Sequence, residues 1–288
     1  MKKNRIKKFI SFLRKNPSFT IGFVIIVITL FIAIFADVIV PYDPAASSPK
    51  VRLAPPFWSK DANPDYLLGT DYIGRDLTSR LFMGIRTSVI ISTLSVGTAI
   101  FIGMLVGLIS GLAHPGFLDS ILMRITDIQM GFPFIVLAII ILTMVEPTVI
   151  SCIVVLSLAS WPVYARVLRS NVMIEKEMDY IAAAKAMGAS KTRIAVKYLG
   201  RSFMSAILPV MPMDIAGVII TESLLSFMSI GIQPPNISLG NIMADGRNYI
   251  ATSWWITAMP GIIVMIIVLG LNLMGDALQK YFNPNLSN

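Results

Sequence analysis

The residues that could do chemistry in this chain are few, and the most unusual are acidic groups inside apolar runs. Asp214 and Glu222 share one such run, two helical turns and about 80° apart around a helix, so they could border one cavity. An ionisable group buried in a membrane is costly and usually functional. Glu222 is predicted to face a water-filled path and meet a ligand cation; the alternative is a hydrogen bond to a neighbouring helix backbone.

Enzymatic chemistry is not predicted. The single histidine, His114, has no triad partners, and no cluster of Cys, His and carboxylates predicts a metal site. The phosphate-binding pattern G-x-x-x-x-G-K-[ST] is absent, its nearest imitation being residues 188–192. The single Cys152 lies in an apolar run and is predicted to be a core residue. We expect no catalytic residue, no metal and no cofactor bound by this chain.

The composition is that of an integral membrane protein. Of the 288 residues, 55% are hydrophobic and 14% charged, whereas a soluble domain carries about a quarter charged residues. A membrane span needs about 20 mostly apolar residues. Six segments qualify, at about 19–40, 87–112, 121–145, 148–166, 203–230 and 254–273. The predicted fold is therefore all-α with six transmembrane helices. Pro133 is expected to divide the third span, and Pro209 and Pro212 to bend the fifth.

Basic residues orient these spans. With the N-terminus inside, the cytoplasmic segments hold 17 Lys and Arg and the opposite side holds 7, which predicts that both termini are cytoplasmic. The net charge of +8 is therefore expected to face the lipid bilayer and cytoplasmic partners, and no nucleic acid. The first apolar run is too long for a signal peptide, so an uncleaved span is predicted.

The predicted organisation has five parts. They are a basic cytoplasmic N-terminus at 1–18, the first transmembrane helix at 19–40, an extracytoplasmic segment with an interfacial helix at 41–86, a five-helix core at 87–276 and a cytoplasmic tail at 277–288. Asp76 and Arg80 have the i,i+4 spacing of a pair on the interfacial helix. Gly103, Gly107 and Gly111 form two overlapping G-x-x-x-G units, which predict close helix packing on the second span.

A basic, helix-prone loop within residues 171–202 is predicted to dock on a soluble partner. Its apolar stripe consists of Met178, Ile181, Ala182 and Ala186. Gly188 is expected to end the first helix, because glycine tolerates the left-handed C-terminal cap. Ser190 is expected to cap a second helix.

This loop resembles the one by which permease subunits of ABC importers bind their ATPases, whose pattern is Glu-Ala-Ala, three residues and Gly. Three further motifs occur in the same order as in one family: LGTDYIGRD, SLLSFMSIGIQPPNISLGNIMADGR at 223–247 and LNLMGDALQKYFNP at 271–284. Over about residues 67–284 the chain is similar to the C-type inner-membrane permeases of dipeptide, oligopeptide and nickel ABC importers.

The resemblance implies a type I importer permease fold and a multi-pass position in the cell membrane of a prokaryote. It implies a second permease subunit, two cytoplasmic ATPases that bind ATP and Mg, and an extracytoplasmic binding protein. It places Asp214, Glu222 and Gln233 along the translocation path. It assigns the ATPase-coupling loop to Met178, Asp179, Ile181, Ala182, Ala183, Ala184, Lys185, Met187, Gly188 and Arg193.

The loop departs from the family pattern at two places. Ala182 stands where the family usually has Glu, and Gly200-Arg201 stands where it usually has Leu-Pro. Asp179, one helical turn earlier, could compensate for the missing carboxylate.

The predicted function is a permease subunit for peptides, with nickel, metallophore or glutathione transport as alternatives in the same family. A second class of alternative is a stand-alone ion-coupled transporter that uses Asp214 and Glu222, which inverted-repeat hydropathy would favour. No such repeat is evident in the sequence. A membrane scaffold without a path would leave these two acidic residues unexplained.

Overall fold

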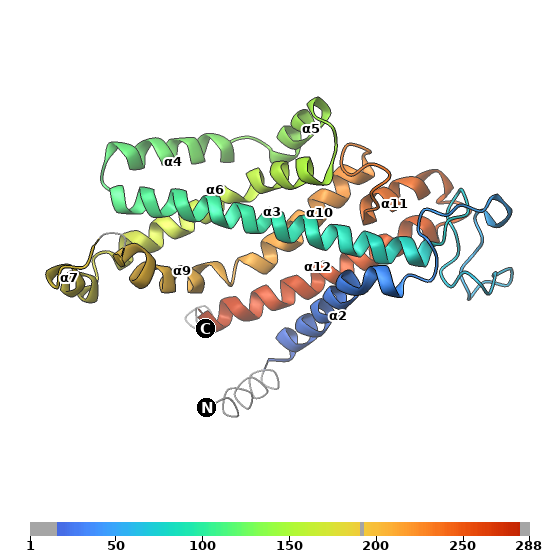
Figure 1. The fold of residues 1–288 in the computed structure, drawn as a ribbon, viewed down its shortest axis with the longest axis horizontal. Coiled ribbons are helices and arrows are strands. Elements are labelled where there is room, and N and C mark those ends of the chain that lie inside the picture. The colour runs from blue at the N-terminus through green and yellow to red at the C-terminus, as the bar shows by residue number, and fades with distance from the viewer. Residues whose placement is uncertain (1–15, 191–192, 283–288) are drawn as a thin grey trace.

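The computed structural model describes residues 16–190 and 193–282, apart from the side chains of Val196, Arg201 and Ser202. Most of the predicted basic N-terminus, the end of the tail and part of the second loop helix therefore lie outside the described residues. The regular elements are helices (Figure 1): α2 (Pro17–Ile39), η1 (Pro49–Val51), α3 (Leu77–Ala113), α4 (Phe117–Met130), α5 (Phe134–Met144), α6 (Val149–Glu175), α7 (Asp179–Ala186), η2 (Ile194–Leu199), α9 (Gly200–Ile207), α10 (Met211–Phe227), α11 (Leu239–Gly246), η3 (Arg247–Tyr249) and α12 (Trp255–Phe282).

The long helices run along one another in an elongated bundle (Figure 1). The irregular segment between α2 and α3 lies at one end, and α7 lies at the other. Within the described residues, four helices are long and apolar enough to cross a membrane, or up to five if α4 and α5 form one span bent by 86°. The all-helical membrane fold is therefore confirmed.

The second predicted span and the interfacial helix are one continuous helix, α3. Asp76 begins this helix, because its carboxylate accepts hydrogen bonds from the Ser79 backbone N–H at 2.7 Å and from the Ser79 hydroxyl at 2.6 Å. The predicted pairing of Asp76 with Arg80 is wrong. The Asp76 carboxylate serves as the helix cap, and the Arg80 guanidinium turns to Asp71 and Asp245.

Two predicted spans are interrupted where prolines occur. Residues 131–133 separate α4 from α5, as Pro133 predicts. Residues 208–210, which include Pro209, separate α9 from α10, and Pro212 lies in the first turn of α10. Proline has no N–H to continue the hydrogen-bond ladder, so it favours a helix start and weakens a helix interior, although α6 and α12 continue through Pro162 and Pro260.

The three spaced glycines of α3 lie against α6, as their spacing predicts. A Cβ atom at Gly103 would lie 2.5 Å from the Tyr164 Cβ atom, and one at Gly107 would lie 2.6 Å from the Ala165 carbonyl oxygen. At Gly111 the nearest atom would be the Val172 Cβ, at 2.7 Å. Only glycine lets the two backbones approach this closely.

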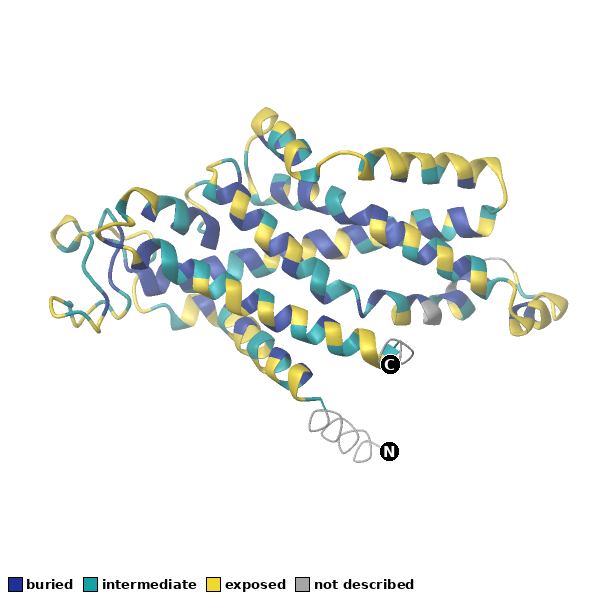
Figure 2. Cartoon of the chain, turned by 180° about the vertical axis from the view of Figure 1, so that it is seen from behind, coloured by how far each residue is buried: buried dark blue, intermediate teal, exposed yellow. Residues whose placement is uncertain are grey.

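Buried apolar side chains form two cores, and α10 contributes to both. One core lies around α3 and α6 and includes Val218 and Leu225 of α10. The other joins α2, α11, α12 and the start of α3, and it includes Ala216 and Ile219 of α10. The outer faces of α2, α4 and α5 are largely exposed in the single chain (Figure 2).

Replacing Gly107 with Leu is expected to destabilise the protein strongly, because the new side chain must push α3 away from α6. Overpacking of this kind costs about 1–3 kcal/mol or more. Gly97→Leu is the matched control on the same helix, because an added Cβ there meets no atom within 4 Å. Thermal unfolding in detergent measures the difference, and equal melting temperatures for the two variants would contradict the packing role.

Candidate functional site

The first part of the candidate site is α7, which projects at one end of the molecule (Figure 1). The helix ends where predicted, since Gly188 has a φ of +80°. The Gly188 N–H donates to the Lys185 carbonyl at 3.0 Å, and the Ala189 N–H donates to the Ala184 carbonyl at 3.0 Å. The Ser190 hydroxyl then accepts a hydrogen bond from the Arg193 N–H at 3.2 Å, as expected for a helix start.

Two of the predicted coupling residues face the inside of this chain. Ile181 is 0% exposed and Ala184 is 1% exposed. Ile181 belongs to the same apolar core as Ile194 and Leu199. The prediction that Ile181 presses into a groove on a partner is therefore wrong, because its side chain already stabilises the loop against the bundle.

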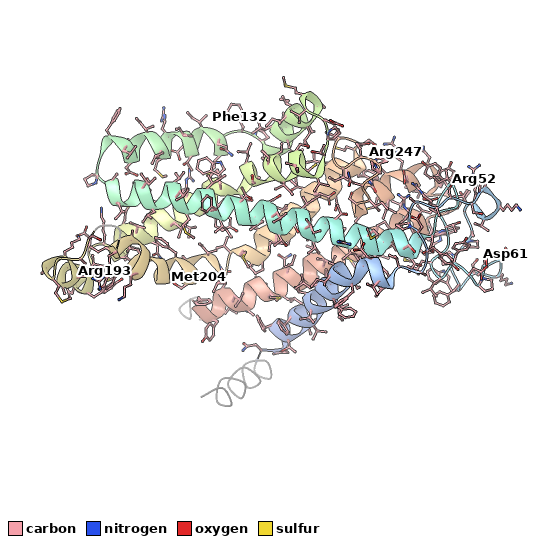
Figure 3. The ribbon with its side chains drawn as sticks, viewed as in Figure 1. Arg52, Asp61, Phe132, Arg193, Met204 and Arg247 are labelled. Atoms are coloured by element: carbon pink, nitrogen blue, oxygen red, sulfur yellow. The ribbon has the colours of Figure 1, made fainter. Side chains whose placement is uncertain are left out.

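The other face of the loop is open. Met178 and Met187 are exposed, and so are Asp179, Ala182, Ala183, Lys185, Gly188 and Arg193. Figure 3 places Arg193 beside α7 at the end of the molecule. Sequence reasoning missed Tyr180, which is exposed and stacks on Tyr198 with ring centroids 6.3 Å apart. Its spacing of i,i+3 to Ala183 and i,i+7 to Met187 is the signal that could have found it.

The second part of the candidate site is the Glu222 carboxylate, which the structure encloses. It accepts hydrogen bonds from the Ser88 hydroxyl of α3 at 3.0 Å and from the Ser226 hydroxyl of α10 at 2.8 Å. Glu222 is 2% exposed in this conformation. In this conformation Glu222 therefore does not face a water-filled path, contrary to the prediction. The alternative, a hydrogen bond to a neighbouring helix, is present, although the donor is a side chain.

Asp214 has a different set of neighbours. It lies in the first turn of α10 and accepts a hydrogen bond from the Ser160 hydroxyl of α6 at 2.7 Å. Asp214 and Glu222 are separated by about 12 Å of helical rise and contact α6 and α3 respectively. The expectation that they border one cavity is therefore not supported, because each carboxylate anchors α10 to a different helix.

Gln233 lies in the loop after α10, at the end of the molecule opposite α7. It lines a cavity of about 240 Å³ together with Arg75, Arg80 and Asp245. The Gln233 amide donates to the Ser229 carbonyl at 2.9 Å. The place of Gln233 in this cavity is compatible with the predicted position at the outer mouth of a path.

A cluster of four charged residues beside this cavity was not predicted. Arg75 contacts Asp71 at 2.6 Å and Asp245 at 3.0 Å. Arg80 contacts Asp71 at 3.1 Å and Asp245 at 2.9 Å. The side chains of Asp71 and Arg80 are only 1% and 3% exposed. Because two of the charges lie before α3 and one lies in α11, the cluster holds the segment between α2 and α3 against α11.

Asp245→Asn is expected to destabilise the end of the molecule opposite α7, because two guanidinium groups lose one of their carboxylate partners. Partial exposure of Asp245 limits the loss to about 1–3 kcal/mol. The loss would be measured as a lower unfolding temperature and as faster trypsin cleavage after Lys50 or Arg52. Asp37→Asn is the control, because the Asp37 side chain is 64% exposed in its pair with Arg86, and such pairs contribute little. Equal cleavage in both variants would show that the cluster does not hold this segment.

Glu222→Gln and Glu222→Leu should separate hydrogen bonding from charge at this position. Gln keeps polar atoms for Ser88 and Ser226, so the protein is expected to fold with a small loss of stability. Leu removes the acceptor of the buried Ser88 and Ser226 hydroxyl groups, at about 1–3 kcal/mol for each group. Melting temperature in detergent measures both. A Leu variant as stable as the Gln variant would remove the anchoring role.

The comparisons with known proteins agree with one another. The family described as "Binding-protein-dependent transport system inner membrane component" matches residues 99–288, and "N-terminal TM domain of oligopeptide transport permease C" matches residues 5–56. The chain is 34% identical to the dipeptide transport system permease protein DppC of Haemophilus influenzae, covering 99% of this chain and 96% of the relative. It is 32% identical to the di/tripeptide transport system permease protein DppC of Pseudomonas aeruginosa, covering 98% and 93%.

The fold is also similar to that of a solved transporter. A chain in the inward-facing MetNI methionine ABC transporter matches with a TM-score of 0.60 and 19% identity, over 72% of this chain and 97% of that chain. Together with the family match over residues 99–288 and the nearly full-length relatives, this similarity of fold leads to one conclusion: the protein belongs to the family of inner-membrane components of binding-protein-dependent transport systems.

Proposed function

We propose that this chain is a permease subunit of an ATP-driven importer of peptides in the cell membrane of a prokaryote. The observation that carries the proposal is similarity to dipeptide and di/tripeptide permeases over nearly the whole chain, at 34% and 32% identity. The chain catalyses no reaction itself and binds no cofactor; ATP and Mg are bound by partner ATPases. A second permease subunit and an extracytoplasmic binding protein complete the importer.

The proposed topology has six spans with both termini in the cytoplasm. The spans are α2, α3, α4 with α5, α6, α9 with α10, and α12. The start of α2 and the end of α12 both lie toward the α7 end of the molecule, which supports this arrangement (Figure 1). Residues 1–18 and 277–288 are then cytoplasmic, 41–86 extracytoplasmic, and 87–276 the core.

The exposed face of α7 is the proposed ATPase contact. Met178, Tyr180 and Met187 provide apolar side chains, and Lys185 and Arg193 provide positive charge around them. Asp179 supplies the carboxylate that the family has at the position of Ala182.

The buried face of α7 explains how movement reaches the spans. Ile181 shares an apolar core with Leu199 of η2 and with Leu168 of α6. A displacement of α7 by the ATPases would reach η2, which α7 contacts, and then α9, which packs on α6 and leads into α10. Alternating access would follow as a shift of packed helices.

Purification and transport test this proposal together. We expect two ATPase subunits and a second permease to purify with this chain. The complex in proteoliposomes should import a dipeptide only when its binding protein is outside and ATP is inside. Import driven by a proton gradient without ATP would instead support an ion-coupled transporter.

Gly188→Val is expected to abolish import and to weaken ATPase co-purification. A β-branched residue is strongly disfavoured at φ +80°. An added Cβ at Gly188 meets no atom within 4 Å, so crowding would not cause the loss. Gly188→Asn is the matched control, because Asn tolerates this conformation, and it should retain most import. Normal import by the Val variant would remove the loop from the mechanism.

A further inference from the structure

A second cavity, of about 230 Å³, lies among α2, α3, α10 and α12. Its wall is apolar apart from three hydroxyl residues, Thr29, Ser92 and Thr93. The Thr29 hydroxyl donates to the Ile25 carbonyl at 2.9 Å, and the Ser92 hydroxyl donates to the Val89 carbonyl at 3.2 Å. These two hydroxyls are therefore bonded within their own helices, and the space offers little to hold water or a polar ligand.

The way in which α2 is attached to the bundle explains why this space is left. Near its start α2 lies against α12, since a Cβ atom at Gly22 would lie 2.5 Å from the Gly270 carbonyl oxygen. Near its end α2 approaches α3, where Asp37 pairs with Arg86. Toward its start α2 diverges from α3 (Figure 1), and only the small side chain of Ser92 and its neighbours line the gap from α3.

The cavity lies at the depth of the hydrocarbon and can be reached from outside the chain. Thr29 is near the middle of the 23-residue α2, and Ile267 is near the middle of the 28-residue α12. Leu30 of α2 and Thr93 of α3 both line the cavity and are exposed in the single chain. A hydrocarbon chain can therefore enter between these two helices.

The cavity is separate from the exposed face of α10. Met211, Ile215 and Ile219 line it at intervals of four residues, so they lie on one side of the helix. Ile220 and Leu224 are exposed and lie about 140° or more around the helix from Ile215. A ligand in the cavity would therefore not occupy that exposed face.

We propose that the cavity binds an acyl chain of a bilayer phospholipid, which lies between α2 and the rest of the bundle. An empty space of this size would leave its apolar wall without contacts, and a smaller apolar cavity of about 150 Å³ already binds benzene. In a bilayer the apolar ligand present in excess is the lipid chain. The inference goes beyond the proposed function, because it depends only on the membrane fold and not on the transported substrate.

The test is photo-crosslinking of the assembled importer in nanodiscs of phosphatidylethanolamine and phosphatidylglycerol. The probe is a phosphatidylglycerol that carries a diazirine near the methyl end of one acyl chain, and mass spectrometry identifies the labelled residues. We expect label on Ile219 and Leu271, which line the cavity and are only 1% and 6% exposed. Lipid that stays outside the bundle would not reach them.

Ser92→Leu and Thr29→Leu each fill the cavity from one wall. Each added side chain should exclude about two methylene groups of the lipid, which lowers the affinity for the chain, and the label, about 10-fold. Thr98→Leu is the matched control, because Thr98 is exposed on α3 and does not line the cavity. Its label should equal that of the unmodified importer. Size-exclusion chromatography with the ATPases checks assembly, and either filling variant suffices for the comparison.

Three results would overturn the inference. Label on outward residues of α2 such as Ile34, which is 68% exposed, with none on Ile219 or Leu271, would show that lipid does not enter the cavity or that the second permease closes it. Undiminished label in an assembled filling variant would show that the label arises elsewhere. An equal loss in Thr98→Leu would show that the loss is not specific to the cavity.

Discussion

The close approach of α3 and α6 is the contact on which the rest of the arrangement depends. Three glycines remove the side chains that would keep the two backbones apart, so α6 is held in register with α3 over about two helical turns. That register places Arg166 opposite Asp127 and Trp161 opposite Gln129. It therefore sets the height at which α4 ends and the chain bends. Without an apolar driving force between helices in lipid, such backbone contact is a main source of specificity.

The α10 helix lies between two apolar cores and is fixed by polar side chains at two heights. Asp214 bonds to α6 near its start, and Glu222 bonds to α3 two turns later. Beyond its end, the loop that carries Gln233 reaches the four-charge cluster around Asp245. The acidic residues that look most like ligand groups thus serve as anchors in this conformation. Each anchor is hydrogen-bonded to a hydroxyl, which limits the cost of burying a carboxylate.

Much of the fold could be predicted from local sequence patterns, because the length of an apolar run and the positions of proline and glycine determine the structure of the residues next to them. The break at Pro133 and the turn at Gly188 are of this kind. The errors came from partners distant in sequence. Arg80 was matched to Asp76, four residues away, whereas its partner Asp245 is 165 positions away. Ile181 was predicted to contact a partner for the same reason, since Ile194 and Leu199 of its own chain join it in one core only after the loop folds back.

The division of α7 into two faces has a consequence for how such loops change. Ile181 and Ala184 secure the helix to its own chain, whereas Met178, Tyr180 and Met187 point outward and bear little of that stability. Substitutions on the outer face can therefore accumulate without unfolding the loop. Thioether side chains adapt readily to differently shaped surfaces. If the exposed face of α7 is the ATPase contact proposed above, a few substitutions on it would suffice to fit the chain to a different ATPase, and the membrane-embedded part could stay unchanged.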